Sequence, residues 1–321
     1  MSMPHAVAAT ADELPIGSTI CEGRFTIEAI LGRGGVATVY RVATEGGRSV
    51  AVKVMLEDRA QDPDQRDRFD NEGRILEGLG EVPYVPGFVG RGHLQSPDRR
   101  PYIAMELSQG PTLDRLLRGQ RVAAHTRVRR ACTVVRNVAD ALADLHSRGV
   151  IHRDIKPSNI AVEGDAVRLL DFGYAHSAGD GELPSTAGLT MVEHRPGTYL
   201  YMAPEQALGQ APGPSFDVYA LAVTLFEALA GRAPFQDLPP SEMARLKCEP
   251  KEPEISIAGR VFGLPSDLEE LVDHGLRRLP GERIASAAEL RDQLDTVLAK
   301  LPIGDDESPR HDLVVTAPAP S

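Results

Sequence analysis

Residues 152 to 159, His-Arg-Asp-Ile-Lys-Pro-Ser-Asn, constrain this chain more than any other segment. Within one short stretch Asp154 supplies a carboxylate, Lys156 a cation and Asn159 an amide oxygen. Transfer of a phosphoryl group to a hydroxyl needs a carboxylate near the incoming O–H and positive charge near the transferred group. An amide oxygen can in addition hold a metal ion. Chance is a poor explanation for these three residue types at these spacings, so the segment predicts a phosphoryl-transfer loop.

A second carboxylate follows twelve residues after Asn159. Asp171-Phe172-Gly173 comes directly after the apolar residues 167–170, which predict a strand. By itself this tripeptide is a common turn. Because Mg²⁺ prefers oxygen ligands, Asn159 and Asp171 together are candidates for a magnesium site.

A glycine-rich turn lies near the start of the chain. Glycines let backbone N–H groups approach phosphate oxygens without a clash from Cβ. A dinucleotide-binding fold would place a helix directly after the glycines, but β-branched residues follow here, which favours a strand–turn–strand flap. A structural turn without a ligand is the alternative for this segment alone. The predicted nucleotide-binding residues of the flap are Leu31, Gly32, Arg33, Gly34, Gly35, Val36, Ala37, Thr38 and Val39.

Lys53 lies in a predicted strand, residues 49–55, about 20 residues after the flap. A lone lysine in a strand is usually a surface residue. However, Asp62-Pro63 predicts the start of a helix that carries Glu72 in an otherwise apolar stripe. A carboxylate facing the interior needs a cationic partner. We therefore expect an ion pair between Lys53 and Glu72 that directs Lys53 towards nucleotide phosphates.

The second half of the chain has helical periodicity. An amphipathic stripe over residues 128–145 ends at Gly149, and residues 217–230 are apolar on nearly all sides, which predicts a central buried helix. Residues 1–23 are small and polar and predict a flexible leader, whereas the Pro-, Ala- and Asp-rich residues 300–321 predict a disordered tail.

Net charge and the length of the apolar stretches disfavour several classes of partner. The formal net charge is −11, which disfavours nucleic acid or an anionic membrane because both need phosphates neutralised by cations. The longest apolar stretch, residues 218–226, is far shorter than the roughly 18 residues of a membrane span. No signal peptide is evident at the N-terminus, and Cys21, Cys132 and Cys248 form no C-x-x-C pair. Reduced thiols and a cytoplasmic location are the expectation.

These motifs, together with Ala203-Pro204-Glu205, follow one another in an order that resembles the protein kinases. The resemblance covers residues 24–299, and the sequence around Tyr199 and Asp217 is most similar to the bacterial eukaryotic-type serine/threonine kinases. It implies an α+β, bilobal fold. The mostly-β N-lobe would span residues 24–105, the hinge 106–109 and the mostly-α C-lobe 110–299.

The resemblance also implies a role for each matching residue. Met105 would be the gatekeeper, and Ala51, Glu106 and Leu107 would bind the nucleotide with the flap and Lys53. The catalytic set would consist of Lys53, Glu72, Asp154 and Lys156. Asp154 would orient the acceptor hydroxyl, and Lys156 would contact the γ-phosphate of ATP. Asn159 and Asp171 would bind Mg²⁺, and Glu205 would pair with Arg283. Ala37 and Ala161 stand where the family often has a glycine and a larger apolar residue.

The implied activity is ATP-dependent phosphorylation of serine and threonine hydroxyls in proteins, because Lys156 resembles the serine/threonine class. Two alternatives stay open. A pseudokinase scaffold usually lacks one of the catalytic carboxylates, and all are present here. A small-molecule kinase lacks a residue like Lys156 and the Ala-Pro-Glu segment, and both are present as well.

The segment between Asp171 and Glu205 is predicted to be a phosphorylation switch, with Thr190 as the site. Arg153 adds a cation beside Asp154, and a guanidinium can bind a phosphate with two hydrogen bonds. Thr198 is expected to face the catalytic loop instead, and Thr186 lies farther out. The alternative is a mobile loop that is merely rich in hydroxyls. Autophosphorylation in trans would require self-association.

Overall fold

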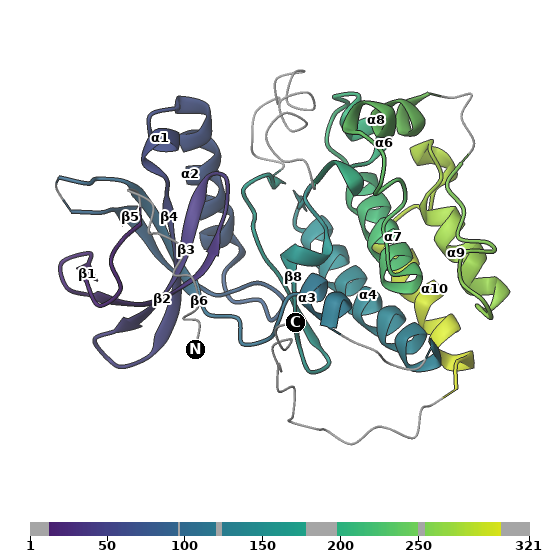
Figure 1. The fold of residues 1–321 in the computed structure, drawn as a ribbon, viewed down its shortest axis with the longest axis horizontal. Helices are drawn as coiled ribbons and strands as arrows, with labels where there is room; N and C mark the ends of the chain where they lie inside the picture. Colours follow the sequence, from purple (N-terminus) through teal and green to yellow (C-terminus); the bar gives the residue numbers. More distant parts are fainter. Residues whose placement is uncertain (1–12, 96, 120–123, 178–197, 250–253, 303–321) are drawn as a thin grey trace, which may run out of the picture.

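The computed structural model describes residues 13–95, 97–119, 124–177, 198–249 and 254–302. They form two lobes: a curled sheet with one long helix beside it, and a larger lobe built of helices (Figure 1). The expected α+β, bilobal architecture is confirmed. No described helix is both long and apolar enough to cross a membrane. Cys21, Cys132 and Cys248 are free thiols.

The sheet of the first lobe is antiparallel and has the strand order β1-β2-β3-β4-β6-β5. Its strands are β1 (Thr19–Ile20), β2 (Phe25–Arg33), β3 (Ala37–Thr44), β4 (Ser49–Met55), β5 (Phe88–His93) and β6 (Pro101–Glu106). β4 is rich in valine, whose branched Cβ suits a strand, and it is the central strand that carries Lys53. The turn between β3 and β4 contains Gly47 at φ +73°, a conformation that glycine adopts without strain.

Two helices follow β4: α1 (Glu57–Ala60) and α2 (Pro63–Leu79). α2 begins where the sequence predicts, because the Asp62 carboxylate caps it by accepting a hydrogen bond from the Asp64 backbone N–H at 2.9 Å. At Gly73 the helix comes so close to the sheet that an added Cβ would lie 2.8 Å from Arg91 Cδ. Glycine at this position lets α2 lie close to β5 and β6, and Glu72 precedes it directly.

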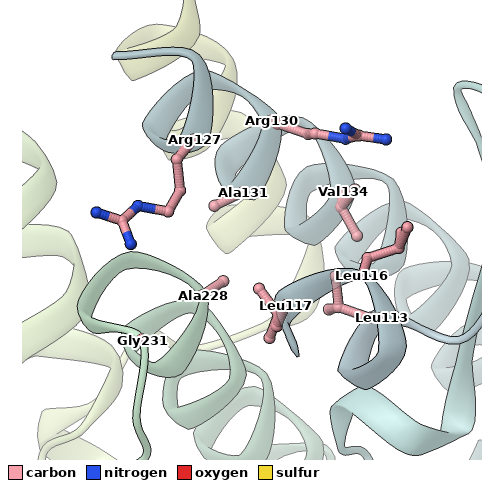
Figure 2. Close-up of a pocket in the computed structure, with 9 residues that line it drawn as sticks. All are labelled: Leu113, Leu116, Leu117, Arg127, Arg130, Ala131, Val134, Ala228 and Gly231. Atoms are coloured by element: carbon pink, nitrogen blue, oxygen red, sulfur yellow. The ribbon is translucent and has the colours of Figure 1, made fainter. Parts of the chain in front are cut away.

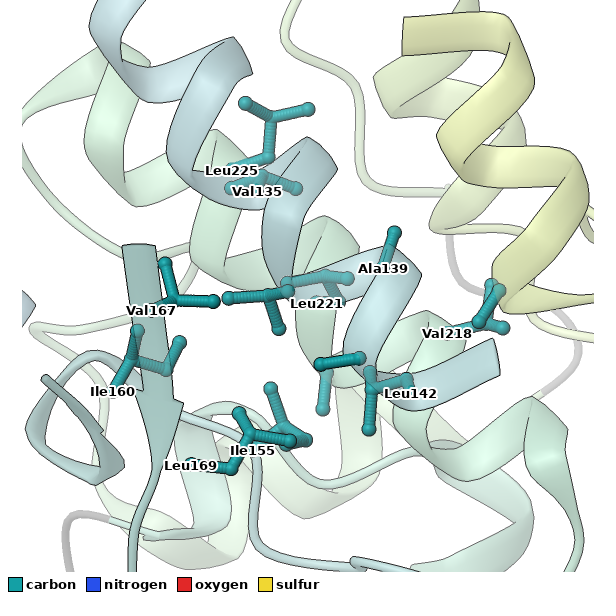
Figure 3. Packing of buried hydrophobic residues seen from close by; sticks show 14 of the residues in the cluster. Val135, Ala139, Leu142, Ile155, Ile160, Val167, Leu169, Val218, Leu221 and Leu225 are labelled. Carbon is teal, nitrogen blue, oxygen red and sulfur yellow. The ribbon is translucent and has the colours of Figure 1, made fainter. Parts of the chain in front are cut away.

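The second lobe is centred on α4 (Ala124–Ser147) and α7 (Pro214–Ala230). Figure 3 shows Val135, Ala139 and Leu142 of α4 close to residues of α7. The short hairpin of β8 (Ile160–Glu163) and β9 (Ala166–Leu169) inserts apolar side chains into the same core. Ile155, in the loop of residues 152–159 that is the predicted catalytic loop, is also in this core and is fully buried. The packing of Ile155 in the core therefore holds the loop that carries Asp154 in place.

The remaining elements surround this core. They are α3 (Leu113–Gly119), β7 (Val150–Ile151), η1 (Pro157–Asn159), β10 (His176–Ser177), η2 (Thr198–Leu200), α6 (Pro204–Ala207), α8 (Pro240–Cys248), α9 (Ser266–Gly275), η3 (Pro280–Glu282) and α10 (Ala287–Lys300). β7 pairs with β10, which ties the residues after Gly173 to the catalytic loop. A hollow of about 60 Å³ lies between α3, α4 and α7 and is lined mainly by leucine and alanine side chains (Figure 2). It contains none of the residues predicted for the site.

Candidate active site

Lys53 lies between two carboxylates that come from different lobes. Its ammonium is 2.7 and 2.8 Å from the two carboxylate oxygens of Glu72 on α2, and 2.9 Å from Asp171 Oδ1. The Glu72 side chain is 3% exposed and the Lys53 side chain 12%. Burial opposes the charge of Lys53, but Asp171 and Glu72 outweigh it and raise its pKa. The predicted pair is present, and the structure extends it to a third residue.

The glycine-rich flap is a strand–turn–strand unit, as predicted. Residues 31–33 end β2, residues 34–36 make the turn, and residues 37–39 begin β3. The Gly34 N–H donates to the Ala37 carbonyl at 2.9 Å, which closes the turn. Val36 lines the same small recess as Lys53 and Asp171, so the turn lies next to the ion pair. The Arg33 guanidinium pairs with Glu13.

The catalytic loop brings together the three side chains that the sequence singled out. The Lys156 ammonium is 2.9 Å from each carboxylate oxygen of Asp154. The Asn159 amide nitrogen donates to the Asp154 carbonyl at 2.8 Å and to Asp154 Oδ2 at 3.0 Å. Asp154 is buried, and its carboxylate is thus held in one orientation by a cation and an amide.

Asp217 of α7 binds the backbone of this loop through its carboxylate, a role that the sequence alone did not assign. Its two oxygens accept the backbone N–H groups of His152 at 2.9 Å and Arg153 at 2.8 Å, and His146 Nε2 lies 2.9 Å away. Burial opposes the charge of Asp217, but the contact with His146 outweighs it and lowers the pKa. Arg153 has φ +64°, a conformation that costs free energy in a residue with a side chain. The buried carboxylate stabilises that strained backbone.

The two metal candidates lie at the same end of the β8–β9 hairpin. Ile160 pairs with Leu169, and the Leu170 N–H donates to the Asn159 carbonyl at 2.8 Å, so Asn159 and Asp171 flank one edge. Asn159 donates hydrogen bonds from its amide nitrogen to Asp154, and its amide oxygen has no hydrogen-bond partner among the described residues. One amide oxygen and one carboxylate are a donor set that fits Mg²⁺ with waters or phosphates completing its shell. The described residues contain no cluster of three or more His, Cys, Asp or Glu with metal-site geometry.

The residues predicted to lie around the hinge are held by strand pairing and by ion pairs. Ala51 of β4 pairs with Met105 of β6, the predicted gatekeeper. The Glu106 carboxylate is bound by Arg48 at 2.5 Å and Arg168 at 3.0 Å, and mainly the hydrogen bond from Arg168 lowers its pKa. Its side chain thus joins the two lobes.

Glu205 and Arg283 form the ion pair that the resemblance implies. Two parallel contacts of 2.7 and 3.0 Å join the guanidinium to the carboxylate, and both residues are buried. Arg153 is half-buried, and its Nε is buried without a hydrogen-bond partner among the described residues. Burial lowers the pKa of Arg153 to about 10, and the nearby Arg68 adds to this effect. Thr186 and Thr190 lie outside the described residues, as does the side chain of Thr198.

With this geometry in place, the comparisons identify the class. Residues 25–294 match the family described as "Protein kinase domain", and the chain belongs to that family. It is 34% identical over 278 residues to the serine/threonine-protein kinase PknB of Mycobacterium tuberculosis. That match covers 84% of this chain and 42% of PknB, so the chain spans less than half of the relative's length.

Two further proteins are similar. The serine/threonine-protein kinase Pkn1 of Myxococcus xanthus is 34% identical over 305 residues, which are 92% of this chain and 41% of Pkn1. The crystal structure of a single-residue mutant of the Mycobacterium tuberculosis PknI kinase domain has a TM-score of 0.64 at 24% identity. The match covers 89% of this chain and 99% of that domain, and at this identity it supports the fold alone.

Proposed function

We propose that this chain is an active serine/threonine protein kinase that transfers the γ-phosphoryl group of ATP to hydroxyls of proteins. The observation that carries the proposal is the Lys53 ammonium bonded at once to Glu72 and Asp171. This arrangement requires α2 and the segment after β9 to be in place at the same time. Phosphoryl transfer depends almost entirely on positioning and charge stabilisation, and both lobes contribute to them here.

Each side chain of the site has a step that its chemistry suits. Lys53 binds the phosphates of the nucleotide under the flap formed by residues 31–39. The Asp154 carboxylate accepts a hydrogen bond from the acceptor hydroxyl and orients its oxygen towards the γ-phosphorus. Lys156, 2.9 Å from Asp154, is placed to balance the negative charge on the transferred group. Hydrogen bonds from Asn159 keep Asp154 in position.

Asn159 and Asp171 are proposed to hold Mg²⁺ by an amide oxygen and a carboxylate oxygen. When bound there, Mg²⁺ would supply positive charge to the phosphate oxygens. Ser108, in the predicted hinge, has a buried hydroxyl without a partner among the described residues, and a nucleotide base next to the hinge would satisfy it.

Protein rather than small-molecule acceptors are favoured by a specific observation. The carbonyls of Tyr199, Leu200 and Met202, directly before α6, are bound by the Lys247 ammonium of α8. Gln206 of α6 donates to the Arg153 carbonyl, so this backbone segment is held near the catalytic loop, where it suits the docking of an extended peptide. We further propose the boundaries 24–105, 106–109 and 110–299 for the two lobes and the hinge, a cytoplasmic location, and self-association for autophosphorylation in trans.

The test is phosphate transfer by the purified chain with labelled ATP and Mg²⁺, alone and with a generic protein acceptor. The control is Asp154→Asn, which keeps the size of the side chain but removes its charge. We expect the variant to bind nucleotide and to lose turnover by about 10²–10⁴-fold. Equal activity of the two proteins would contradict the assignment of Asp154 and favour a scaffold.

A further inference from the structure

Lys247 on α8 is a buried cation with no role in the chemistry described above. The residue is 2% exposed, and its ammonium donates to the carbonyls of Tyr199 at 2.9 Å, Leu200 at 2.5 Å and Met202 at 3.0 Å. An ammonium has three N–H donors, and here each has one backbone acceptor. A single side chain thus fixes the path of four consecutive residues.

The charge of Lys247 has no carboxylate partner among the residues that the structure describes. The rings of Tyr199 and Tyr219 face the ammonium at 5.8 and 5.4 Å. From its own helix it faces the Cys248 thiol, while Glu205 of α6 is occupied by Arg283 and the Arg278 guanidinium donates to the Leu246 carbonyl. Burial lowers the pKa of Lys247 to about 7.

A buried lysine without a counter-ion is costly, so its contacts must supply something that an apolar residue cannot. The residues it binds are the last before Ala203-Pro204-Glu205. On their other side, Tyr201 donates to Glu227 at 2.5 Å, and Gln206 of α6 donates to the Arg153 carbonyl at 2.9 Å. The segment from 199 to 202 is therefore bound to α7 through Tyr201 and to α8 through Lys247, and α6, which follows it directly, is bound to the catalytic loop through Gln206.

We propose that Lys247 is a positioning residue for the protein acceptor: by binding three carbonyls, it holds the backbone of residues 199–202 in the shape against which the acceptor peptide docks. The inference rests on the proposed kinase function and adds to it a determinant of acceptor binding on α8. A methionine at this position would fill the same volume but leave three buried carbonyls without donors. The segment would shift, while the nucleotide site around Lys53 would stay intact.

The experiment compares wild type with Lys247→Met, Lys247→Arg and Arg245→Met, using myelin basic protein as acceptor. Arg245 is an exposed cation on the same helix and serves as the matched control. We expect Lys247→Met to raise KM for the acceptor about tenfold, the worth of one hydrogen bond, and to leave KM for ATP and the ATP hydrolysis rate without acceptor unchanged. Lys247→Arg, which keeps the charge and the donors, should recover most of the acceptor affinity, and Arg245→Met should match wild type.

An unchanged acceptor KM in Lys247→Met overturns the inference. If Lys247→Met loses ATP binding in parallel, the variant has not folded, and wild type and Lys247→Arg then decide through pH. As pH rises from about 6 to about 8, Lys247 loses a proton and one donor, so acceptor KM should rise in wild type but not in the arginine variant. The same profile in both proteins would also overturn it. A wild-type chain that phosphorylates no protein refutes the proposed function instead.

Discussion

At the scale of single residues, the site depends on charges that stabilise one another across the fold. Lys53 is nearly buried and would be unfavourable there as an isolated cation, and Glu72 would be unfavourable as an isolated anion. Together with Asp171 they form a set in which each charge is compensated. Removing any member leaves the others uncompensated, so the three residues should behave as one unit.

The first prediction concerns this unit. Lys53→Met should abolish phosphoryl transfer, and Glu72→Gln should impair it severely because it releases Lys53 from its position. Steady-state kinetics on both single variants and the double variant measure the coupling between them. We expect the double variant to be scarcely worse than Lys53→Met alone. Losses that simply add would mean that the ion pair is not a functional unit.

A second residue-scale prediction concerns Arg153. Its buried Nε lacks a partner among the described residues and Arg68 is a neighbouring cation, so an anion near them would be bound strongly. We expect Thr190 to carry phosphate in the active protein, and Arg153→Ala to lower activity about tenfold by removing one charge-assisted hydrogen-bond partner. Mass spectrometry of wild type beside the inactive Asp154→Asn reports the modification. Full activity with an unmodified Thr190 would refute this switch.

At the scale of elements, local signals in the sequence were sufficient for some parts of the fold. Asp62-Pro63 gives the start of α2 because capping is a contact between near neighbours, and Glu72 stands out within the apolar stripe of that helix. The roles of Asp217 and Lys247 were not predictable. Their partners are backbone groups 45 to 65 residues away, and backbone groups have no identity in a sequence. The Glu106–Arg168 contact was missed because the two residues lie 62 positions apart and Arg168 resembles an ordinary surface charge.

The α8 element gives a prediction for stability. Lys247 has a pKa of about 7 in the folded chain and about 10.4 when unfolded, so between these values the unfolded state binds more protons. The free energy of unfolding should therefore rise with pH in this window, by up to about 1.4 kcal/mol per pH unit from this group. Denaturant unfolding of wild type and Lys247→Met at several pH values measures it. The variant should lack this rise, whereas Arg245→Met should retain it.

At the scale of the whole molecule, several polar contacts between described residues bridge the lobes, and two of them involve residues predicted for the site. Lys53 of β4 reaches Asp171 beyond β9, and Glu106 at the end of β6 accepts from Arg168 of β9. Arg48, next to β4, binds the same Glu106 carboxylate, so the hinge is held by charges from both sides. A nucleotide between the flap and the β8–β9 hairpin would add contacts to both lobes. Nucleotide binding should therefore stabilise both lobes together against unfolding.

The last prediction tests this coupling and the metal candidates together. A non-hydrolysable ATP analogue with Mg²⁺ at about 100 times its Kd should add about 2.7 kcal/mol of stability, which raises Tm by about 5 °C for a chain of this size. Asp171→Asn removes a proposed metal ligand, so most of the increment that depends on Mg²⁺ should disappear, as it should in wild type after chelation. Asp295→Asn, far from the site in an exposed pair with Arg136, is the matched control and should respond as wild type does. Thermal unfolding followed by circular dichroism measures each shift, and an undiminished Mg²⁺ increment in Asp171→Asn would remove Asp171 from the metal site.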